Sequence, residues 1–293
     1  MSQLKFGRII TAMVTPFNER GQVDFEEAIR LGEHLVATGT DTILLAGTTG
    51  ESPTLTHDEE YELFAQFVRQ FKGRAKIMAG TGSNSTATAI ATTRHAETLG
   101  VDGVLQVVPY YNKPSQEGMF QHFKAVAEST SLPVLLYNIP GRTGVNMLPE
   151  TMVRLSAISN IIGVKEAAGS LDQMTAIRQV TPPDFVIYSG DDALTVPFMQ
   201  AGAVGVVSVA SQVVGTDMRH MVDAVVSGDV EKALQLDAKL SLLFKALFVT
   251  SNPTPVKAAL RQLGFRVGIP RLPLVDVTPV EDALLRAELA KLF

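Results

Sequence analysis

Residues 161–170 read IIGVKEAAGS and contain the pattern that decides the fold. The stretch begins as an uninterrupted apolar run, which is typical of a strand covered on both faces, as in a parallel sheet. Small and polar residues end the run, and a helix-like segment, 171–180, follows. Lys165 conflicts with this pattern, because a charged ammonium group inside an apolar strand costs several kcal/mol unless it is paired or loses its proton.

The same strand-and-helix unit recurs along the chain. The apolar runs are 8–17, 41–47, 75–80, 103–109, 133–140, 161–167, 185–190 and 203–210. The helix-like segments between and after them are 24–38, 56–68, 86–99, 118–129, 149–158, 171–180, 192–200 and 212–227. This alternation predicts a parallel α/β fold, and the number of units favours a closed (β/α)₈ TIM barrel, although periodicity alone leaves an open doubly wound sheet possible.

The last part of the chain lacks a further strand pattern. Helical spacing continues in 230–249, 255–263 and 280–292. We therefore expect a barrel domain over 1–227, which carries the active site, and a small C-terminal helical domain over 228–293.

Composition limits the classes of function. The 293 residues are 46% hydrophobic and 19% charged, with a net charge of −5 and no basic cluster, so we expect no nucleic-acid partner. Cysteine is absent, which excludes disulfides and thiolate zinc sites. The five histidines form no HxH or HExxH pattern, and no dinucleotide fingerprint follows the glycines at 80–82. We therefore expect neither a metal nor an organic cofactor.

Two segments bear on the location of the protein. Residues 193–216 carry no charge and are long enough to cross a bilayer, but Pro197, Gln200 and Gln212 interrupt them, so a helix followed by a buried strand is the better interpretation. The N-terminal residues have neither a small-residue cleavage pattern nor an Arg/Ser-rich composition. We expect a cytoplasmic protein without a membrane segment.

Polar residues follow most of the predicted strands. In a TIM barrel the active site forms at the carboxyl ends of the strands, so these groups are expected to converge on one face. The segments concerned are TPF at 15–17, GTTGE at 47–51, YY at 110–111, YNIPGRTG at 137–144, KE at 165–166 and SGDD at 189–192.

Lys165 is the candidate nucleophile. An apolar pocket lowers the pKa of a lysine, and the neutral amine attacks a ketone or aldehyde to form a Schiff base. The alternative is a lysine that pairs with Glu166 or reaches solvent at the strand end. The gathering of other polar groups at the strand ends favours the catalytic interpretation.

Four further features have both a functional and a structural interpretation. Tyr137 is a candidate proton carrier if hydroxyls such as that of Thr48 assist it, or else a core aromatic residue. The GTTG turn at 47–50 suits a carboxylate, because two glycines allow a tight turn with N–H groups on one side, but it also fits a plain loop. Arg142 is either a bidentate carboxylate ligand or a solvated arginine. Asp191 and Asp192 are better explained as a helix N-cap than as metal ligands.

Taken together, the motifs resemble those of the dihydrodipicolinate synthase family, within the N-acetylneuraminate lyase superfamily of class I aldolases. The matching pieces span nearly the whole chain: GTTGES at 47–52, PYYNKPSQEG at 109–118, YNIPGRTG at 137–144, GVKEA at 163–167, YSGDD at 188–192 and NPTPVK at 252–257. The combination is specific, whereas no single motif would be.

The resemblance implies a lyase of lysine and diaminopimelate biosynthesis. Pyruvate would form a Schiff base with Lys165, and its enamine would attack L-aspartate 4-semialdehyde to give 4-hydroxy-tetrahydrodipicolinate. The catalytic residues would be Lys165, Tyr137, Thr48 and Tyr111, and the substrate-binding residues would be Thr49, Arg142, Gly190 and Val207. Sugar-acid aldolases of the same superfamily are the main alternative, and Arg142 argues against them because the semialdehyde carries a carboxylate. A catalytically silent, ligand-binding barrel is a further alternative, which the combination of Lys165, Tyr137 and Thr48 disfavours.

The resemblance also implies an assembly and a regulator. Tyr111 would enter the site of a neighbouring subunit in a homotetramer built from two dimers. The product L-lysine would bind at positions matched here by Ser52, His57, Glu60, Asn84 and Tyr110. Glu60 stands where many lysine-sensitive members have histidine, and Thr88 stands where they have glutamate. Without that glutamate the hold on the amino group of the ligand should weaken, but the Glu60 carboxylate can compensate, so some lysine inhibition is expected to remain.

Overall fold

The computed structural model describes residues 4–293. This part of the chain contains one sheet, in which the strands follow the order β1 to β8 and close into a barrel. The strands are β1 (Ile9–Ala12), β2 (Thr42–Leu45), β3 (Lys76–Gly80), β4 (Gly103–Val107), β5 (Val134–Asn138), β6 (Ile161–Glu166), β7 (Val186–Ser189) and β8 (Gly205–Ser208). The predicted (β/α)₈ class is confirmed.

Helices alternate with these strands and continue after the last of them. The α-helices are α1 (Phe25–Ala37), α2 (His57–Phe71), α3 (Thr86–Thr98), α4 (Gln116–Ala127), α5 (Pro140–Thr143), α6 (Pro149–Leu155), α7 (Leu171–Val180), α8 (Thr195–Gln200), α9 (Ser211–Ser227), α10 (Val230–Ala246), α11 (Thr254–Gln262) and α12 (Pro279–Leu289). Short 3₁₀ turns lie at η1 (Ser52–Thr54) and η2 (Asp192–Leu194).

The sequence explains why these elements form where they do. All four residues of each of β1, β2 and β8 are buried, as expected for continuous apolar runs covered on both faces. Several helices begin at a side chain that accepts a hydrogen bond from the first turn. Thr56 does so in a complete capping box with Glu59, and Ser170 caps α7 by accepting from the Gln173 N–H.

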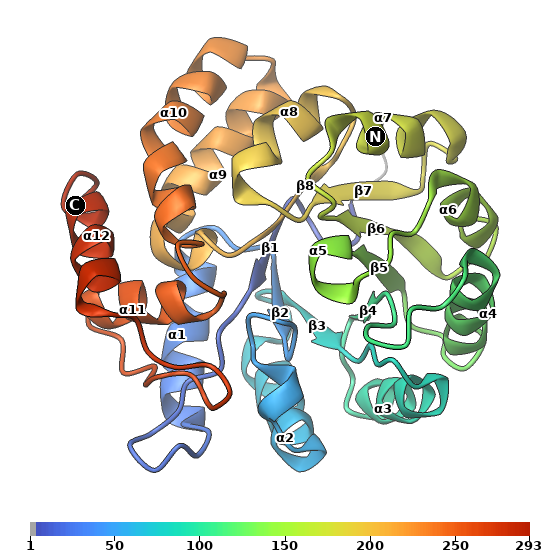
Figure 1. Cartoon of the computed structure of the whole chain (residues 1–293), viewed down its shortest axis with the longest axis horizontal. Coiled ribbons are helices and arrows are strands. Elements are labelled where there is room, and N and C mark those ends of the chain that lie inside the picture. The colour runs from blue at the N-terminus through green and yellow to red at the C-terminus, as the bar shows by residue number, and fades with distance from the viewer. Residues whose placement is uncertain (1–3) are drawn as a thin grey trace. The chain divides into compact units, whose positions relative to one another are not determined.

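The chain divides into two compact units, and each is described by itself. One comprises the chain up to Lys76 together with Ser208–Phe293, and the other comprises Ile77–Val207. In the first, α10 packs against α9 and α12, and α11 also packs against α12 (Figure 1). In the second, α3, α4, α6 and α7 contact one another in succession on the outside of the strands (Figure 1). The expected domain boundary at 227/228 stays a prediction.

The structure differs from the expected elements in detail. The strands are shorter than the predicted runs; β1, for example, spans Ile9–Ala12 within the predicted run 8–17. The YNIPGRTG motif contains a short helix, α5, that the sequence did not predict. The backbone of Val214 is non-helical inside α9, which kinks that helix. The uncharged stretch 193–216 folds into parts of η2, α8, β8 and α9. In residues 4–293 no helix combines the length and the apolarity that crossing a membrane requires.

Candidate active site

Lys165 lies on β6 and is buried, with only 6% of its surface exposed. Desolvation lowers the pKa of its ammonium group to about 7. Two nearby charges adjust this value: the carboxylate of Asp192 raises the pKa, and the guanidinium of Arg142 lowers it. A large fraction of Lys165 is therefore neutral amine near pH 7, the form that attacks a carbonyl carbon.

Glu166 is not the partner of Lys165. Successive residues of a strand point to opposite faces of the sheet, so the two side chains diverge. The Glu166 carboxylate instead accepts hydrogen bonds from the side-chain amides of Asn138 and Gln173. Lys165 is also buried, so the two structural alternatives for this lysine, pairing with Glu166 and exposure to solvent, do not hold.

Strand register places Tyr137 beside the lysine. Tyr137 on β5 is aligned with Lys165 on β6, which is aligned in turn with Tyr188 on β7. Aligned residues of parallel strands share a face, so these three side chains form one row. The Lys165 Nζ lies 4.0 Å from the centroid of the Tyr137 ring, and Tyr137 is 4% exposed. The phenol-bearing ring is thus packed against the candidate nucleophile.

The turn after β7 contributes space and charge. A Cβ atom on Gly190 would lie 2.6 Å from Ala167 Cβ and 3.1 Å from Lys165 Cε, so only glycine leaves the lysine its room. Asp191 caps η2 by accepting from the Ala193 N–H at 2.9 Å, as the sequence predicted. Asp192 is buried and acts on the pKa of Lys165, a role that its position in a capping sequence did not reveal.

Arg142 and Val207 occupy different environments. Arg142 lies on α5 and is exposed, although its charge is felt at Lys165. Val207 lies on β8 and is almost fully buried. Both belong to the same compact unit as Lys165.

Tyr111 sits in a strained loop after β4. Its side chain is 89% exposed, and its backbone φ of 74° lies in the left-handed region, as does that of Lys113. Such conformations cost about 1–2 kcal/mol for residues other than glycine and concentrate at functional loops. The loop therefore holds Tyr111 outward from its own unit.

The GTTGE segment belongs to the other unit. Thr48 is half-buried, whereas Thr49 is buried and its Oγ1 accepts from Asn252 Nδ2 at 2.9 Å. The residues with positive φ in this turn are Ala46 and Glu51. They are not the two glycines, which the sequence indicated as the residues that allow the tight turn. Glu51 forms a fully buried ion pair with Lys257, whose Nζ lies 2.6 Å from Glu51 Oε1. The NPTPVK motif, which contains Asn252 and Lys257, thus anchors the turn that follows β2.

The model of the dihydrodipicolinate synthetase family matches residues 5–292. The chain belongs to this family.

Similar members of the dihydrodipicolinate synthetase family cover almost the whole chain. A 4-hydroxy-tetrahydrodipicolinate synthase of Cyanothece sp. is 54% identical over 98% of this chain and 98% of its own. The enzyme of that name from Acaryochloris marina is 57% identical over 92% of each chain. The lysine-bound crystal structure of the dihydrodipicolinate synthase from Cyanidioschyzon merolae has a TM-score of 0.97, at 50% identity over 99% of each chain.

Three of the candidate lysine-binding residues lie together in this family member. Ser52 Oγ donates to Glu60 Oε1 at 2.6 Å, and His57 Nδ1 lies 3.2 Å from Glu60 Oε2. Burial raises the pKa of the Glu60 carboxyl, while its bonds to Ser52 and His57 oppose that shift. Asn84 and Tyr110 belong to the other unit, where Tyr110 is 38% exposed.

Sequence reasoning missed the groups that support the site. These are Asp192 near Lys165, the amide network around Glu166, and the buried pair of Glu51 and Lys257. The only sign of the amide network in the sequence was the carboxylate of Glu166, directly after Lys165. Within residues 4–293 no group of three or more histidine, aspartate or glutamate side chains is arranged to hold a metal ion.

Proposed function

We propose that this protein is a lyase that condenses pyruvate with L-aspartate 4-semialdehyde to give 4-hydroxy-tetrahydrodipicolinate, in lysine and diaminopimelate biosynthesis. The observation that carries the proposal is the buried Lys165, with a pKa of about 7 and Tyr137 packed against it, in a chain whose relatives bear the corresponding name.

The first step uses the neutral amine of Lys165. It attacks the ketone carbon of pyruvate, and loss of one water molecule leaves a protonated imine. This imine withdraws electrons, so a proton leaves the methyl carbon and an enamine forms. The pocket favours this step because burial supplies amine at neutral pH without a separate base to deprotonate it.

The second step joins the two substrates. The enamine carbon attacks the aldehyde carbon of the semialdehyde, and the new alkoxide takes a proton to become the hydroxyl group. The amino group of the semialdehyde then attacks the imine carbon and displaces Lys165, which closes the ring. One water molecule is lost overall, and the lysine is regenerated.

Other residues take roles that the family resemblance suggests. We propose that Thr48, Tyr137 and Tyr111 carry protons in these steps and that Thr49 holds the pyruvate carboxylate. Arg142 would bind the carboxylate of the semialdehyde, for which a guanidinium is the suitable partner. Its position in the same unit as Lys165 and its electrostatic effect on that lysine support this role.

We also propose that Gly190 and Val207 line the pyruvate site. The closeness of Gly190 to the lysine supports this, since a Cβ atom at that position would lie 3.1 Å from Lys165 Cε. No cofactor is part of the proposed reaction.

The proposed assembly is a homotetramer of two dimers, in which Tyr111 completes the site of a neighbouring subunit. The exposure and strained backbone of Tyr111 support this, because a phenol held outward in this way is available to a second copy. A monomeric dihydrodipicolinate synthase variant is among the similar solved structures, at 42% identity and a TM-score of 0.96, so the assembly needs its own measurement. Sedimentation velocity should give the tetramer mass, and a stable active monomer would contradict the proposal.

L-lysine is the proposed feedback inhibitor, through Ser52, His57, Glu60, Asn84 and Tyr110. The lysine-bound relative from Cyanidioschyzon merolae supports this, and so does the Ser52–Glu60–His57 cluster. Activity should fall partly as lysine is raised to millimolar levels. Full activity across that range would rule out the regulatory site. The cytoplasm is the proposed location.

Direct assay of the condensation tests the proposal. The protein is incubated with pyruvate and either L-aspartate 4-semialdehyde or N-acetylmannosamine, and the products are identified by mass. Condensation with the semialdehyde alone is expected, and Arg142→Ala should raise the KM for the semialdehyde about 10-fold or more. Turnover of the sugar alone would make the protein a sugar-acid aldolase.

A further inference from the structure

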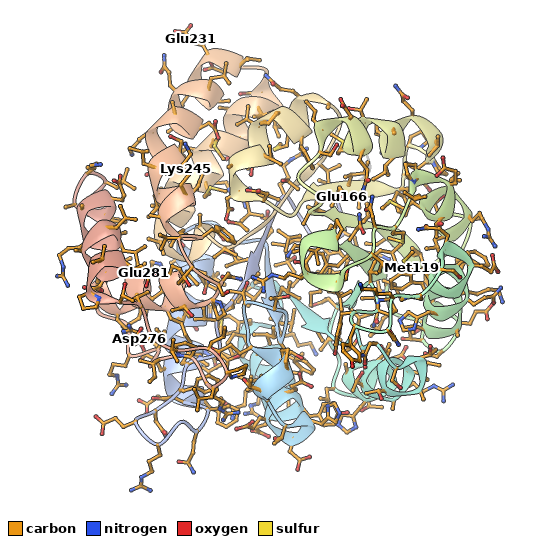
Figure 2. The ribbon with its side chains drawn as sticks, viewed as in Figure 1. Met119, Glu166, Glu231, Lys245, Asp276 and Glu281 are labelled. Atoms are coloured by element: carbon orange, nitrogen blue, oxygen red, sulfur yellow. The ribbon has the colours of Figure 1, made fainter. Side chains whose placement is uncertain are left out.

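We propose that Glu166 is a positioning residue, whose carboxylate fixes the segment that carries Arg142 and thereby sets the affinity for the second substrate. This inference rests on the proposed function, in which Arg142 binds the carboxylate of the semialdehyde. Glu166 is labelled in Figure 2, and it is fully buried at the end of β6.

Glu166 belongs to a second row of side chains, on the face opposite to Lys165. Its aligned neighbours are Asn138 on β5 and Ser189 on β7. This row faces α7, because Gln173 of that helix donates to Glu166 Oε2 at 3.2 Å. The carboxylate is therefore beside the nucleophile in the sequence but does not point toward it.

The Glu166 carboxylate accepts hydrogen bonds from three residues, Asn138, Ala168 and Gln173. Asn138 Nδ2 lies 3.2 and 3.0 Å from its two oxygens, and the Ala168 N–H donates to Oε1 at 2.7 Å. Burial raises the pKa of Glu166, and these amide donors oppose the shift. A carboxylate satisfies every one of these donors, whereas a glutamine would turn an NH₂ group toward one of them.

Glu166 fixes the orientation of Asn138, which closes the Arg142 segment. The chain leaves β5 at Asn138, forms α5 with Arg142, and returns at Asn146 and Met147. Asn138, at the start of this excursion, binds its returning end: the Asn138 Nδ2 donates to Asn146 Oδ1 at 2.8 Å, and the Asn138 Oδ1 accepts from the Met147 N–H at 3.0 Å. With the amide reversed, Asn138 would lose both bonds.

Two further side chains, Gln173 and Gln116, also bind the returning segment of the excursion. Gln173 and Asn146 exchange two amide hydrogen bonds, at 2.6 and 3.1 Å. Gln116 Nε2 donates to the Asn146 carbonyl at 2.8 Å, and Gln116 Oε1 accepts from the Leu148 N–H at 3.1 Å. A connected hydrogen-bond network thus fixes the two ends of the Arg142 segment, Asn138 and 146–147, and Glu166 is its charged member.

The consequence for catalysis is selective. Loosening the network displaces Arg142, and a displacement of about 1 Å costs on the order of 10- to 100-fold in productive binding. Lys165 is on the opposite face, and Glu166 is not among the charges that shift its pKa. The effect should therefore appear in the KM for the semialdehyde and not in formation of the pyruvate adduct.

The test compares Glu166→Gln with Asp172→Asn in the full-length protein. Both changes remove one negative charge, but Asp172 is exposed on α7 and lies outside the network. We expect Glu166→Gln to raise the KM for the semialdehyde about 10- to 100-fold, with the borohydride-trapped pyruvate adduct retained, and Asp172→Asn to behave like the unsubstituted protein. If Glu166→Gln does not fold, Asn146→Ala, at a half-buried position on the returning segment, should give the same selective rise.

A double substitution separates positioning from a general structural effect. If Glu166 acts through Arg142, Arg142→Ala combined with Glu166→Gln should raise the KM no further than Arg142→Ala alone. Multiplying effects, or an unchanged KM in the Glu166→Gln or Asn146→Ala protein, would overturn the inference while leaving the proposed function intact. An unsubstituted protein that forms no pyruvate adduct would overturn both.

Discussion

Replacing Lys165 with methionine should stabilise the protein below pH 7 while abolishing its activity. Burial lowers the pKa of this lysine from 10.5 to about 7. At 1.36 kcal/mol per pKa unit, a shift of this size corresponds to an upper limit of about 4–5 kcal/mol. Below about pH 7 Lys165 is protonated in both the folded and the unfolded state, so the folded protein is destabilised by this full amount.

The pH dependence of this effect has a definite sign. Between pH 7 and 10.5 the unfolded state binds a proton at Lys165 that the folded state does not, so the stability of the unsubstituted protein rises with pH. The advantage of Lys165→Met should therefore be largest near pH 6 and fall to about 1 kcal/mol near pH 10.

The effect is measured by urea unfolding near pH 6 and near pH 10 of the unsubstituted protein, the Lys165→Met protein and a control variant. The control is Lys245→Met, which removes an exposed ammonium from α10, labelled in Figure 2, and should change the free energy of unfolding by less than about 0.5 kcal/mol. A Lys165→Met protein that is no more stable than the unsubstituted protein at pH 6, or whose advantage is the same at both pH values, would refute the reasoning that the buried lysine is held neutral.

Three other predictions follow from the same geometry. The rate of pyruvate adduct formation should rise with pH through about 7 as Lys165 loses its proton, and a flat profile from pH 6 to 9 would contradict the assigned nucleophile. Lys257→Met should lower the free energy of unfolding, measured by urea titration, by about 3–5 kcal/mol, because it leaves the Glu51 carboxylate buried without its cation. The double substitution Lys257→Met with Glu51→Leu should recover much of that loss. Gly190→Ala should abolish borohydride trapping in a folded protein, since its Cβ would meet Ala167 Cβ at 2.6 Å and crowd Lys165; full trapping would show that the turn after β7 yields.

The sequence predicted the strands well because their signal is local. Residues 161–164, for example, are all apolar or glycine, as expected for a strand buried on both faces. The strand ends were less predictable, since β6 ends at Glu166 whereas the predicted strand continues to Ala167. The short helix α5 was missed because its four residues, PGRT, have no helical periodicity and depend on the closure of the surrounding segment.

The site was predictable where chemistry alone points to a residue. A lysine at the end of an apolar strand is unusual in itself, so Lys165 was found. Asp192 and the network of Asn138, Asn146 and Gln173 were not found, because ordinary polar residues acquire such roles only through the tertiary structure. Asn138, for example, meets Glu166 through strand register. That register includes a shift between Val134 and Leu135, which no periodicity argument predicts and which decides what faces Glu166.

Trapping of a pyruvate adduct tests the central claim most directly. The protein is incubated with pyruvate and reduced with borohydride, and intact mass and peptide mapping locate the modification. We expect one pyruvate-derived adduct per chain, on Lys165, and none in the Lys165→Met protein. Folded protein that acquires no adduct, or that is modified at another lysine, would contradict the assignment of Lys165 as a neutral nucleophile.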